Sequence, residues 1–386
     1  MIPRHAPTGQ PAGFSAAPRR AFLAFASSLS IGSLMTLQAQ AETVPSRFEP
    51  AAGPLRDAVN VGRINAAAMW VRQGDAEATW NFGSSDSADD PFLIASISKT
   101  MTVAGMLALV DDGEIDLDAK ASRYLPEFTG DGREGVLVWQ LLTHVSGLPD
   151  QVANNAELRS SHSPLAAFVA AALRAPLAFP PGTAYSYSSM AILLAAEISR
   201  RISGLSLPEL LANRLFRPLG MTTTSLGLGG RDPEKLIACQ VESAAPESGA
   251  GDAAARQWDW NSRYWRDFGA PWGGVHASAR DVGRFLWEAM HPSGLTLRAA
   301  TYRRMTTNQN PAGLTPRGLG FGVGKAASSR YGSPLAFGHT GATGTLAWAD
   351  PKTDTACVVL TTLPGTAMKP HPRQLASDLV GQLAMS

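Results

Sequence analysis

The helix around which this chain is built begins in the stretch Phe92-Leu93-Ile94-Ala95-Ser96-Ile97-Ser98-Lys99, which leads into an almost wholly apolar run before Gly113. A run with almost no polar face is typical of a helix buried within a core, and a glycine just beyond it is typical of a helix end. We therefore expect a buried helix from Ser96. Polar groups at such a place must be hydrogen-bonded or take part in chemistry.

Ser96 and Lys99 lie three residues apart, a spacing that puts both side chains on one helix face with their Cβ atoms about 5–6 Å apart. In a desolvated site the neutral amine of a lysine can accept a serine proton. The helix N-terminus favours the alkoxide and the oxyanion that follow. The alternative is an N-cap serine beside a surface lysine, since such pairs also arise by chance. The scarcity of lysine and the buried helix favour the pair as nucleophile and proton carrier.

Strand signals occur at both ends of the chain. Residues Val61 to Phe82 alternate and contain turn signals, which predicts an antiparallel hairpin. The last third has four short apolar or alternating runs before a helix at Gln374–Ala384; the runs are Phe321–Lys325, Pro334–Gly338, Gly344–Ala349 and Ala356–Thr362. We expect an α/β (α+β) fold in which one antiparallel sheet, flanked by helices, is built from both termini and carries an inserted, mainly helical lobe.

The middle of the chain is mostly helical in its periodicity. Helices are expected at Pro164–Leu173 and Ala191–Ile202, and the small, acidic segment Ala244–Ala255 is expected to be a surface loop. The sequence therefore predicts one hydrolase domain over residues 46–386. Its α/β lobe spans about 46–125 and 270–386, and its helical lobe about 126–269.

Residues 1–41 have the three zones of an export signal. Arg19 and Arg20 precede an apolar stretch, and Ala39-Gln40-Ala41 has the small-x-small pattern of a cleavage site. The paired arginines resemble a twin-arginine signal. The alternative is a retained anchor, but the stretch is short for a membrane span of about 20 residues. We expect a periplasmic or secreted protein.

Charge and cysteine content restrict the partners. The chain has 33 basic and 32 acidic residues, and three arginines lie in the predicted signal, so the mature chain has a net charge of −2. This balance, without a basic tract, favours neither nucleic acid nor a stable membrane partner. Cys239 and Cys357 lie far apart, and we expect free thiols in preference to a disulfide, although export would permit one.

Five segments after the Ser96 stretch resemble, in order and spacing, the serine β-lactamase and penicillin-binding superfamily. They are most similar to class C β-lactamases, serine D-Ala-D-Ala carboxypeptidases and related esterases, over roughly Pro45 to the C-terminus. The segments are Leu141–Leu148, Phe179–Thr183, Tyr185–Ser189, Gly273–Val275 and Gly338–Gly341. The resemblance implies a β-lactamase/transpeptidase-like fold and an acyl-enzyme on Ser96, with neither a metal nor an organic cofactor.

The second motif of that family places a tyrosine beside the nucleophile, and Tyr187 occupies the position. The resemblance implies that Tyr187 and Lys99 exchange the Ser96 proton; which of them is the base is open. A buried aromatic with a satisfied hydroxyl is the structural alternative for Tyr187. Ser189 stands where the family usually has asparagine, which places recognition of a substrate amide in question.

The third motif is Lys-Thr-Gly in β-lactamases, whereas this chain has His339, Thr340 and Gly341. On an edge strand, His339 and Thr340 either bind a substrate carboxylate or support Tyr187, and a histidine would make any charge pH-dependent near about 6.5. A purely structural His339 is the other alternative. The resemblance pairs the Ala342 N–H with that of Ser96 as an oxyanion hole. His144 is expected to be structural.

The sequence therefore predicts a serine hydrolase that acts through an acyl-enzyme on a small ester, amide or peptidoglycan-like substrate. The altered second and third motifs favour an esterase or D-Ala-D-Ala peptidase. A true class C-like β-lactamase and a non-catalytic penicillin-binding or cell-wall sensor protein are the alternatives.

Overall fold

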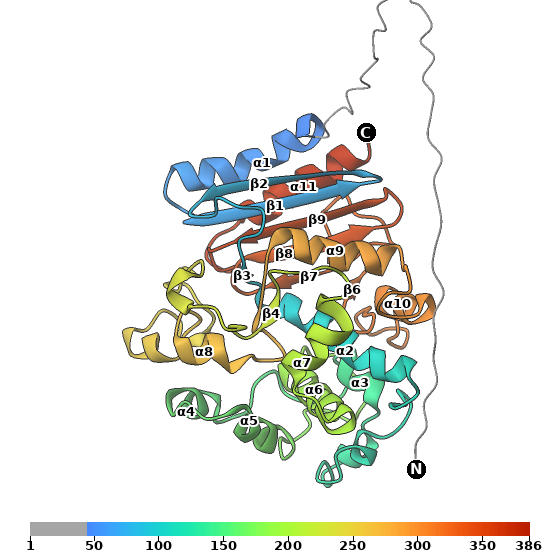
Figure 1. Cartoon of the computed structure of the whole chain (residues 1–386). Helices are drawn as coiled ribbons and strands as arrows, with labels where there is room; N and C mark the ends of the chain where they lie inside the picture. The colour runs from blue at the N-terminus through green and yellow to red at the C-terminus, as the bar shows by residue number, and fades with distance from the viewer. Residues whose placement is uncertain (1–44) are drawn as a thin grey trace, which may run out of the picture. The chain divides into compact units, whose positions relative to one another are not determined.

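A six-stranded antiparallel sheet joins the two ends of the chain in the computed structural model, which describes residues 45–386 (Figure 1). The strand order is β2-β1-β9-β8-β7-β6. The strands are β1 Ala66–Gln73, β2 Ala76–Gly83, β6 Gly322–Val323, β7 Phe337–Gly341, β8 Thr345–Asp350 and β9 Thr355–Thr361. Because β1 pairs with β9, the predicted sheet from both termini is confirmed. The proposed export signal, residues 1–41, lies outside the described residues.

Both faces of the central strands are buried, and alternate residues serve two different cores. In β1, Met69 and Val71 pack with the helices α1, Pro45–Asn60, and α11, Pro372–Ala384. Trp70 faces the opposite way, into the larger core beneath α9, Ala279–Met290. Gly283 of α9 leaves room for the Trp70 indole, because a Cβ there would overlap the ring.

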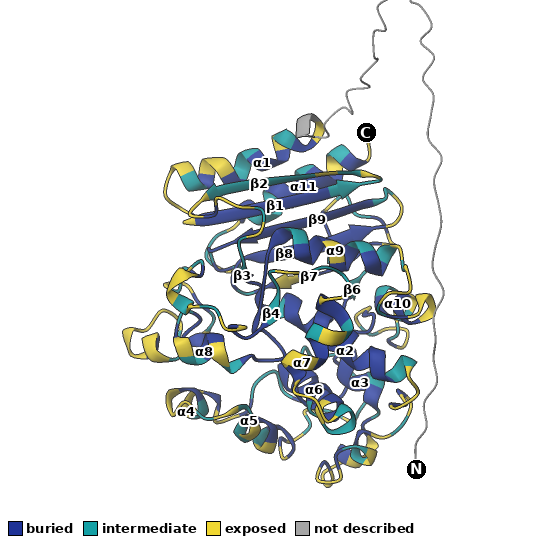
Figure 2. Cartoon of the chain, in the orientation of Figure 1, coloured by how far each residue is buried: buried dark blue, intermediate teal, exposed yellow. Residues whose placement is uncertain are grey.

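The helix predicted from Ser96 is present and almost wholly buried (Figure 2). A short 3₁₀ helix, Ala95–Ile97, leads into α2, Ser98–Asp111, and Gly113 follows with a φ of 80°. The side chain of Ser98 accepts a hydrogen bond from the Val275 N–H, at 3.0 Å. Of the polar residues at the helix start, Ser98 is therefore one that serves the fold.

Helices fill the chain between the strands. The predicted segments at Pro164–Leu173 and Ala191–Ile202 are confirmed as α5 and α6. Helix α5 spans Leu165–Ala172 and α6 spans Ser189–Ser203. The other helices not yet named are α3 Val138–Leu142, α4 Asn155–Ser160, α7 Leu207–Leu211, α8 Arg263–Phe268 and α10 Ala299–Thr306. Of the described helices, none is both long and apolar enough to span a membrane.

Three features differ from the sequence-based expectations. Helices α1, α9 and α10 lie where no element was expected, and a second small sheet joins β3 Phe92–Leu93, β5 Val275–Ala277 and β4 Ser225–Leu226. The segment Ala244–Ala255 is more than a surface loop, because it contains 3₁₀ turns and buries Ser248. The two cysteines are free and buried, as expected.

Candidate active site

The turn that carries Ser96 is held by the strands around it. The Ile94 N–H donates to the carbonyl of Val275 at 3.0 Å, and the Thr345 hydroxyl donates to the carbonyl of Ile94 at 2.9 Å. Ala95 then adopts a φ of 46°, which is uncommon for a residue with a Cβ. The turn places Ser96 at the start of the buried helix with its side chain partly accessible.

Lys99 is buried directly behind this serine. Its Nζ donates to Ser96 Oγ at 3.0 Å and to the Trp272 carbonyl at 2.9 Å. The side chain is 1% exposed, and no carboxylate of the described chain lies within ion-pair distance of it. An amine so placed can exchange a proton with the Ser96 hydroxyl without competition from an acid.

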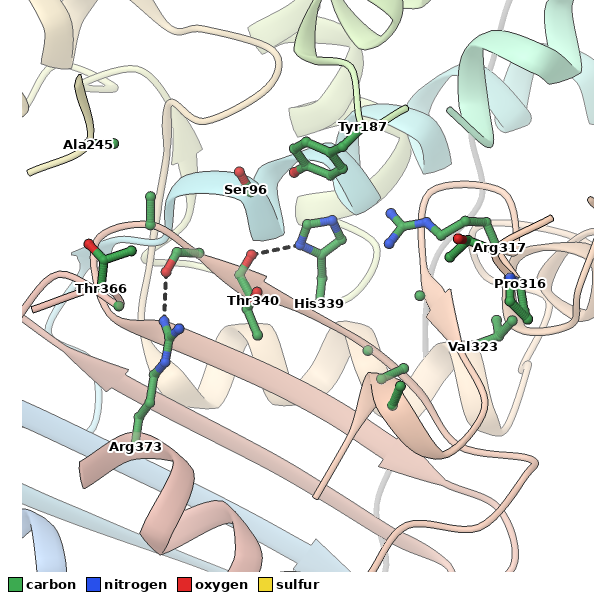
Figure 3. A pocket seen from close by; sticks show the side chains of 18 residues that line it. Ser96, Tyr187, Ala245, Pro316, Arg317, Val323, His339, Thr340, Thr366 and Arg373 are labelled. Carbon is green, nitrogen blue, oxygen red and sulfur yellow. Dashed lines mark hydrogen bonds between the residues drawn. The ribbon is translucent and has the colours of Figure 1, made fainter. Parts of the chain in front are cut away.

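Tyr187 completes the group from a loop that precedes α6. Its ring centroid lies 4.8 Å from Lys99 Nζ, and the rings of His144 and His339 flank it at 4.5 Å and 6.0 Å. Figure 3 shows the Tyr187 hydroxyl pointing toward Ser96. The structure thus brings together the three side chains that the sequence predicted as catalytic.

His144 supports the tyrosine from behind. The Ser188 N–H donates to His144 Nδ1 at 3.2 Å, and Arg317 Nη2 lies 3.1 Å from Nε2. Because the ring is fully buried, its pKa is held well below the ordinary value, and the Arg317 charge adds to this effect. The structural role expected for His144 agrees with this neutral, packed ring.

His339 differs from the expectation of a charge that titrates near 6.5. Its Nδ1 lies 2.7 Å from the Thr340 carbonyl, and its Nε2 is buried without a partner in the described chain. Burial holds the pKa of His339 well below its ordinary value, and the charges of Arg317 and Lys99 lower it further. The ring is therefore neutral at physiological pH, and it packs near Tyr187 while the Thr340 side chain is exposed.

Strand β7, which carries His339 and was expected at the edge of the sheet, is only partly an edge strand. Strand β7 has β6 as its outer neighbour, but β6 pairs with Phe337 and Gly338 alone. The part from His339 to Gly341 is therefore open on that side and borders the cavity at Ser96. Its continuation, Ala342, has a backbone N–H that donates to no acceptor in the described chain, and the same holds for the Ser96 N–H.

Two cavities meet at Ser96, Tyr187 and Ala342. The first, of about 550 Å³, also borders His339, Arg317 and Arg373, whose guanidinium donates to the carbonyls of Gly341 and Thr345 (Figure 3). The second, of about 160 Å³, borders Ser189 together with Asp150, Arg159, Glu247, Ser248 and Trp265. Seven of the eight predicted site residues therefore line this pair of cavities, and the eighth, Lys99, is buried behind Ser96.

Ser189 is buried at the first turn of α6. Its backbone N–H donates to Asp150 Oδ1 at 2.8 Å, and the preceding residue, Ser188, caps the helix through a bond from the Ala191 N–H. Ser189 thus occupies the expected place beside the tyrosine with a shorter side chain than an asparagine.

The three arginines at the cavities, Arg159, Arg317 and Arg373, were not predicted from the sequence. None of them lies in a motif, and none has a carboxylate within ion-pair distance in the described chain. An isolated arginine in a loop or helix has no sequence pattern that distinguishes it from a surface charge. Only the fold reveals that these three are near or at the reacting serine.

Known proteins resemble this chain in sequence and in fold. The family model described as Beta-lactamase matches residues 55–381. Penicillin-binding protein 4 of Amycolatopsis lactamdurans is 30% identical over 67% of this chain and 68% of its own length. Esterase EstB of Burkholderia gladioli is 30% identical over 67% and 72%, respectively. The structure of EstA from Arthrobacter nitroguajacolicus Rue61a superposes with a TM-score of 0.70 at 25% identity, covering 89% of this chain and 98% of EstA.

Proposed function

The chain belongs to the β-lactamase family of serine hydrolases, and from this premise we propose that it hydrolyses carboxylic esters or amides through an acyl-enzyme on Ser96. The observation that carries the proposal is the contact between Ser96 Oγ and the buried Lys99 Nζ, with Tyr187 beside both. The position of the group at the junction of two cavities supports it, because a scissile bond has two sides to accommodate.

In the proposed reaction, Ser96 Oγ attacks the substrate carbonyl while Lys99 and Tyr187 take up its proton. The backbone N–H groups of Ser96 and Ala342, which have no acceptor in the described chain, stabilise the oxyanion. The bond to the alcohol or amine then breaks, and that leaving group receives the proton. Water attacks the acyl-enzyme, the acid is released, and the Ser96 hydroxyl is restored.

An esterase or D-peptidase is favoured over a β-lactamase by two departures from the β-lactamase pattern. Ser189 replaces an amide side chain, and the neutral His339 replaces the lysine of the third motif. The similarity to Esterase EstB supports an esterase. A panel of p-nitrophenyl esters, D-Ala-D-Ala peptides and a chromogenic cephalosporin separates these activities.

We also propose that the protein is exported through residues 1–41 and acts in the periplasm or outside the cell. This rests on the sequence of the signal alone. Fractionation of cells that produce the full chain, with N-terminal sequencing of the protein recovered, tests this proposal. Recovery of the uncleaved chain from the cytoplasm would contradict it.

Covalent labelling tests the nucleophile. We expect a fluorophosphonate to label the wild-type protein, with the adduct on Ser96, and Ser96→Ala to lose both labelling and ester hydrolysis, because Ser96 Oγ is the hydroxyl that Lys99 Nζ contacts. Ser161→Ala, at an exposed serine, is the matched control and should label normally. Labelling retained in Ser96→Ala would remove the proposed nucleophile. A penicillin adduct that forms but never turns over, without hydrolysis of any ester or peptide, would instead support the non-catalytic sensor.

A further inference from the structure

Arg159 is a charged side chain buried in the wall of the second cavity. It is 1% exposed, and the guanidinium carbon lies 4.1 Å from the centroid of the Trp265 ring. Its Nε donates to Asn155 Oδ1 at 3.2 Å, and its Nη1 donates to Ser248 Oγ at 3.3 Å. These neutral partners position the guanidinium but do not balance its charge.

Two donors at this cavity have no acceptor in the described chain. Arg159 Nη2 makes no hydrogen bond, although every other nitrogen of the group does. The indole N–H of Trp265 is buried without a partner. Arg159 lines the cavity, so its free Nη2 can donate to an acceptor that enters there. Burial lowers the pKa of Arg159 only to about 10, so the group is still protonated at neutral pH.

The two acids at the cavity do not occupy this place. Asp150 accepts the Ser189 N–H at the first turn of the 15-residue helix α6, so the positive helix end offsets its charge. Glu247 is half-exposed and lies beyond ion-pair distance of Arg159. The charge of Glu247 raises the pKa of Arg159 only from a distance and against the larger effect of burial, so in the described chain the guanidinium has no ion-pair partner.

The size of the two cavities suggests which part of the substrate enters each. The acyl group stays bonded to Ser96 while the leaving group departs and water enters. The smaller cavity, of about 160 Å³, suits the part that is retained, and the larger, of about 550 Å³, suits the part that leaves. Both border Ser96, so a carbonyl at this serine can extend into both.

We propose that the second cavity binds an acyl group ending in a carboxylate, which pairs with Arg159, so that the preferred substrates are monoesters or monoamides of dicarboxylic acids. This rests on the proposed function, because it needs the acyl-enzyme on Ser96. An arginine presents its donors to a carboxylate in a fixed planar geometry, which makes the preference specific for an anionic oxygen pair over a neutral end of the same length.

The wild-type protein gives the first test. Mono-p-nitrophenyl esters of succinic, glutaric and adipic acid are compared with the same esters whose free carboxylate is capped as a methyl ester. We expect kcat/KM for the best acid to exceed that of its capped form by about tenfold or more, as for a hydrogen bond to a charged group. If kcat/KM of the free acid equals that of its capped form at all three chain lengths, the proposal is overturned. Ser96-dependent hydrolysis of the capped esters would still leave the proposed function standing.

Variants then identify the residue responsible. In Arg159→Met the ratio of kcat/KM for acid and capped ester should fall to about 1, and in Arg159→Lys, which keeps the charge without the planar donors, it should be intermediate. The ratio cancels any general loss of activity. Arg214→Met, at an arginine paired with Asp112 away from both cavities, should keep the wild-type ratio.

Two results of the variant series would overturn the assignment to Arg159. One is an unchanged ratio in Arg159→Met, which would assign the preference to the arginines of the first cavity. The other is an Arg159-dependent preference seen only when the carboxylate is moved to the alcohol part, as in the butyrate ester of 4-hydroxybenzoate. If neither variant folds, the wild-type protein still tests the place of the carboxylate: equal kcat/KM for acid and capped acyl esters, or a preference only for a carboxylate on the alcohol part, would overturn the proposal.

Discussion

At the scale of single residues, the site is organised by a lysine that the fold has removed from water. Lys99 has two oxygen partners, Ser96 Oγ and the Trp272 carbonyl, and the Tyr187 ring covers it from a third direction. The contact to Trp272 orients the amine, while the contact to Ser96 is the one that chemistry can use. The position of Tyr187 beside both gives the proton a second carrier.

Removal of the Tyr187 hydroxyl tests that carrier. We expect Tyr187→Phe to lower kcat for p-nitrophenyl ester hydrolysis by about 10² to 10⁴, the usual range for a lost acid–base group. The ring keeps its packing against His144, so thermal unfolding should change little. Kinetics and a melting curve on the same preparation check this. A variant with near wild-type kcat would leave Lys99 as the sole proton carrier.

His339 shows how far the surroundings alter the chemistry of a residue type. A histidine in a motif suggests titration near neutrality, but this one lies in a buried group with Arg317 and Lys99 close by. Those charges and the loss of water keep the ring neutral, so His339 adds no positive charge beside Tyr187.

At the scale of elements, the site depends on how closely strand β7 approaches the turn at Ser96. Gly341, the last residue of β7, lies against the carbonyl of Ile94, and Thr343 and Thr345 donate to the carbonyls of Leu93 and Ile94. These bonds connect the third motif to the nucleophile turn. They set the distance between the N–H groups of Ser96 and Ala342.

A methyl group at Gly341 should therefore separate the two elements. A Cβ there would overlap the Ile94 carbonyl and the Thr345 hydroxyl, and overpacking of this kind costs about 1–3 kcal/mol. We expect Gly341→Ala to lower kcat/KM by more than about tenfold, because a displaced oxyanion donor costs at least that much. Gly135→Ala, where nothing lies within 4 Å, is the control for activity and for the melting temperature. Unchanged activity in Gly341→Ala would show that this contact does not position the oxyanion donors.

Helix α1 shows why some elements were missed. It spans Pro45–Asn60 and contains Pro50 and Pro54, which argue against a helix when read locally. Its formation depends on Phe48 and Leu55, which pack against the sheet and α11. Tertiary packing outweighs local propensity here, as it does for many amphipathic helices.

At the scale of the whole molecule, the fold buries histidines in their neutral form. Burial lowers the pKa of His276 to about 3 and that of His371 to about 4, with nearby arginine charges adding to the effect, and it holds His144 and His339 well below their ordinary value. Below about pH 6.5 the unfolded chain binds protons that the folded chain does not. Stability should therefore fall as the pH falls from about 6.5 toward these lowered pKa values.

Urea unfolding between pH 7.5 and 5.5 measures this effect. We expect the free energy of unfolding to decrease below pH 6.5 by about 1.4 kcal/mol per pH unit for each histidine that stays neutral in the fold. His276→Asn should have a shallower slope by one such increment, whereas His162→Asn, at an exposed position, should keep the wild-type slope. A His276→Asn slope equal to that of the wild type would contradict a neutral, buried His276.

Much of this protein is determined by its sequence alone. The buried helix after Ser96, the hairpin, the strands near the C-terminus and the spacing of Ser96 and Lys99 depend on local patterns, which neighbouring residues encode. The role of Tyr187 was implied by the resemblance of the ordered motifs to a known family. Only the tertiary structure decided that His339 is neutral and that Arg159 and Arg317 have no acidic partner beside the reacting serine. The physical reason is that burial and charge balance are sums over segments distant in sequence, so no local pattern contains them.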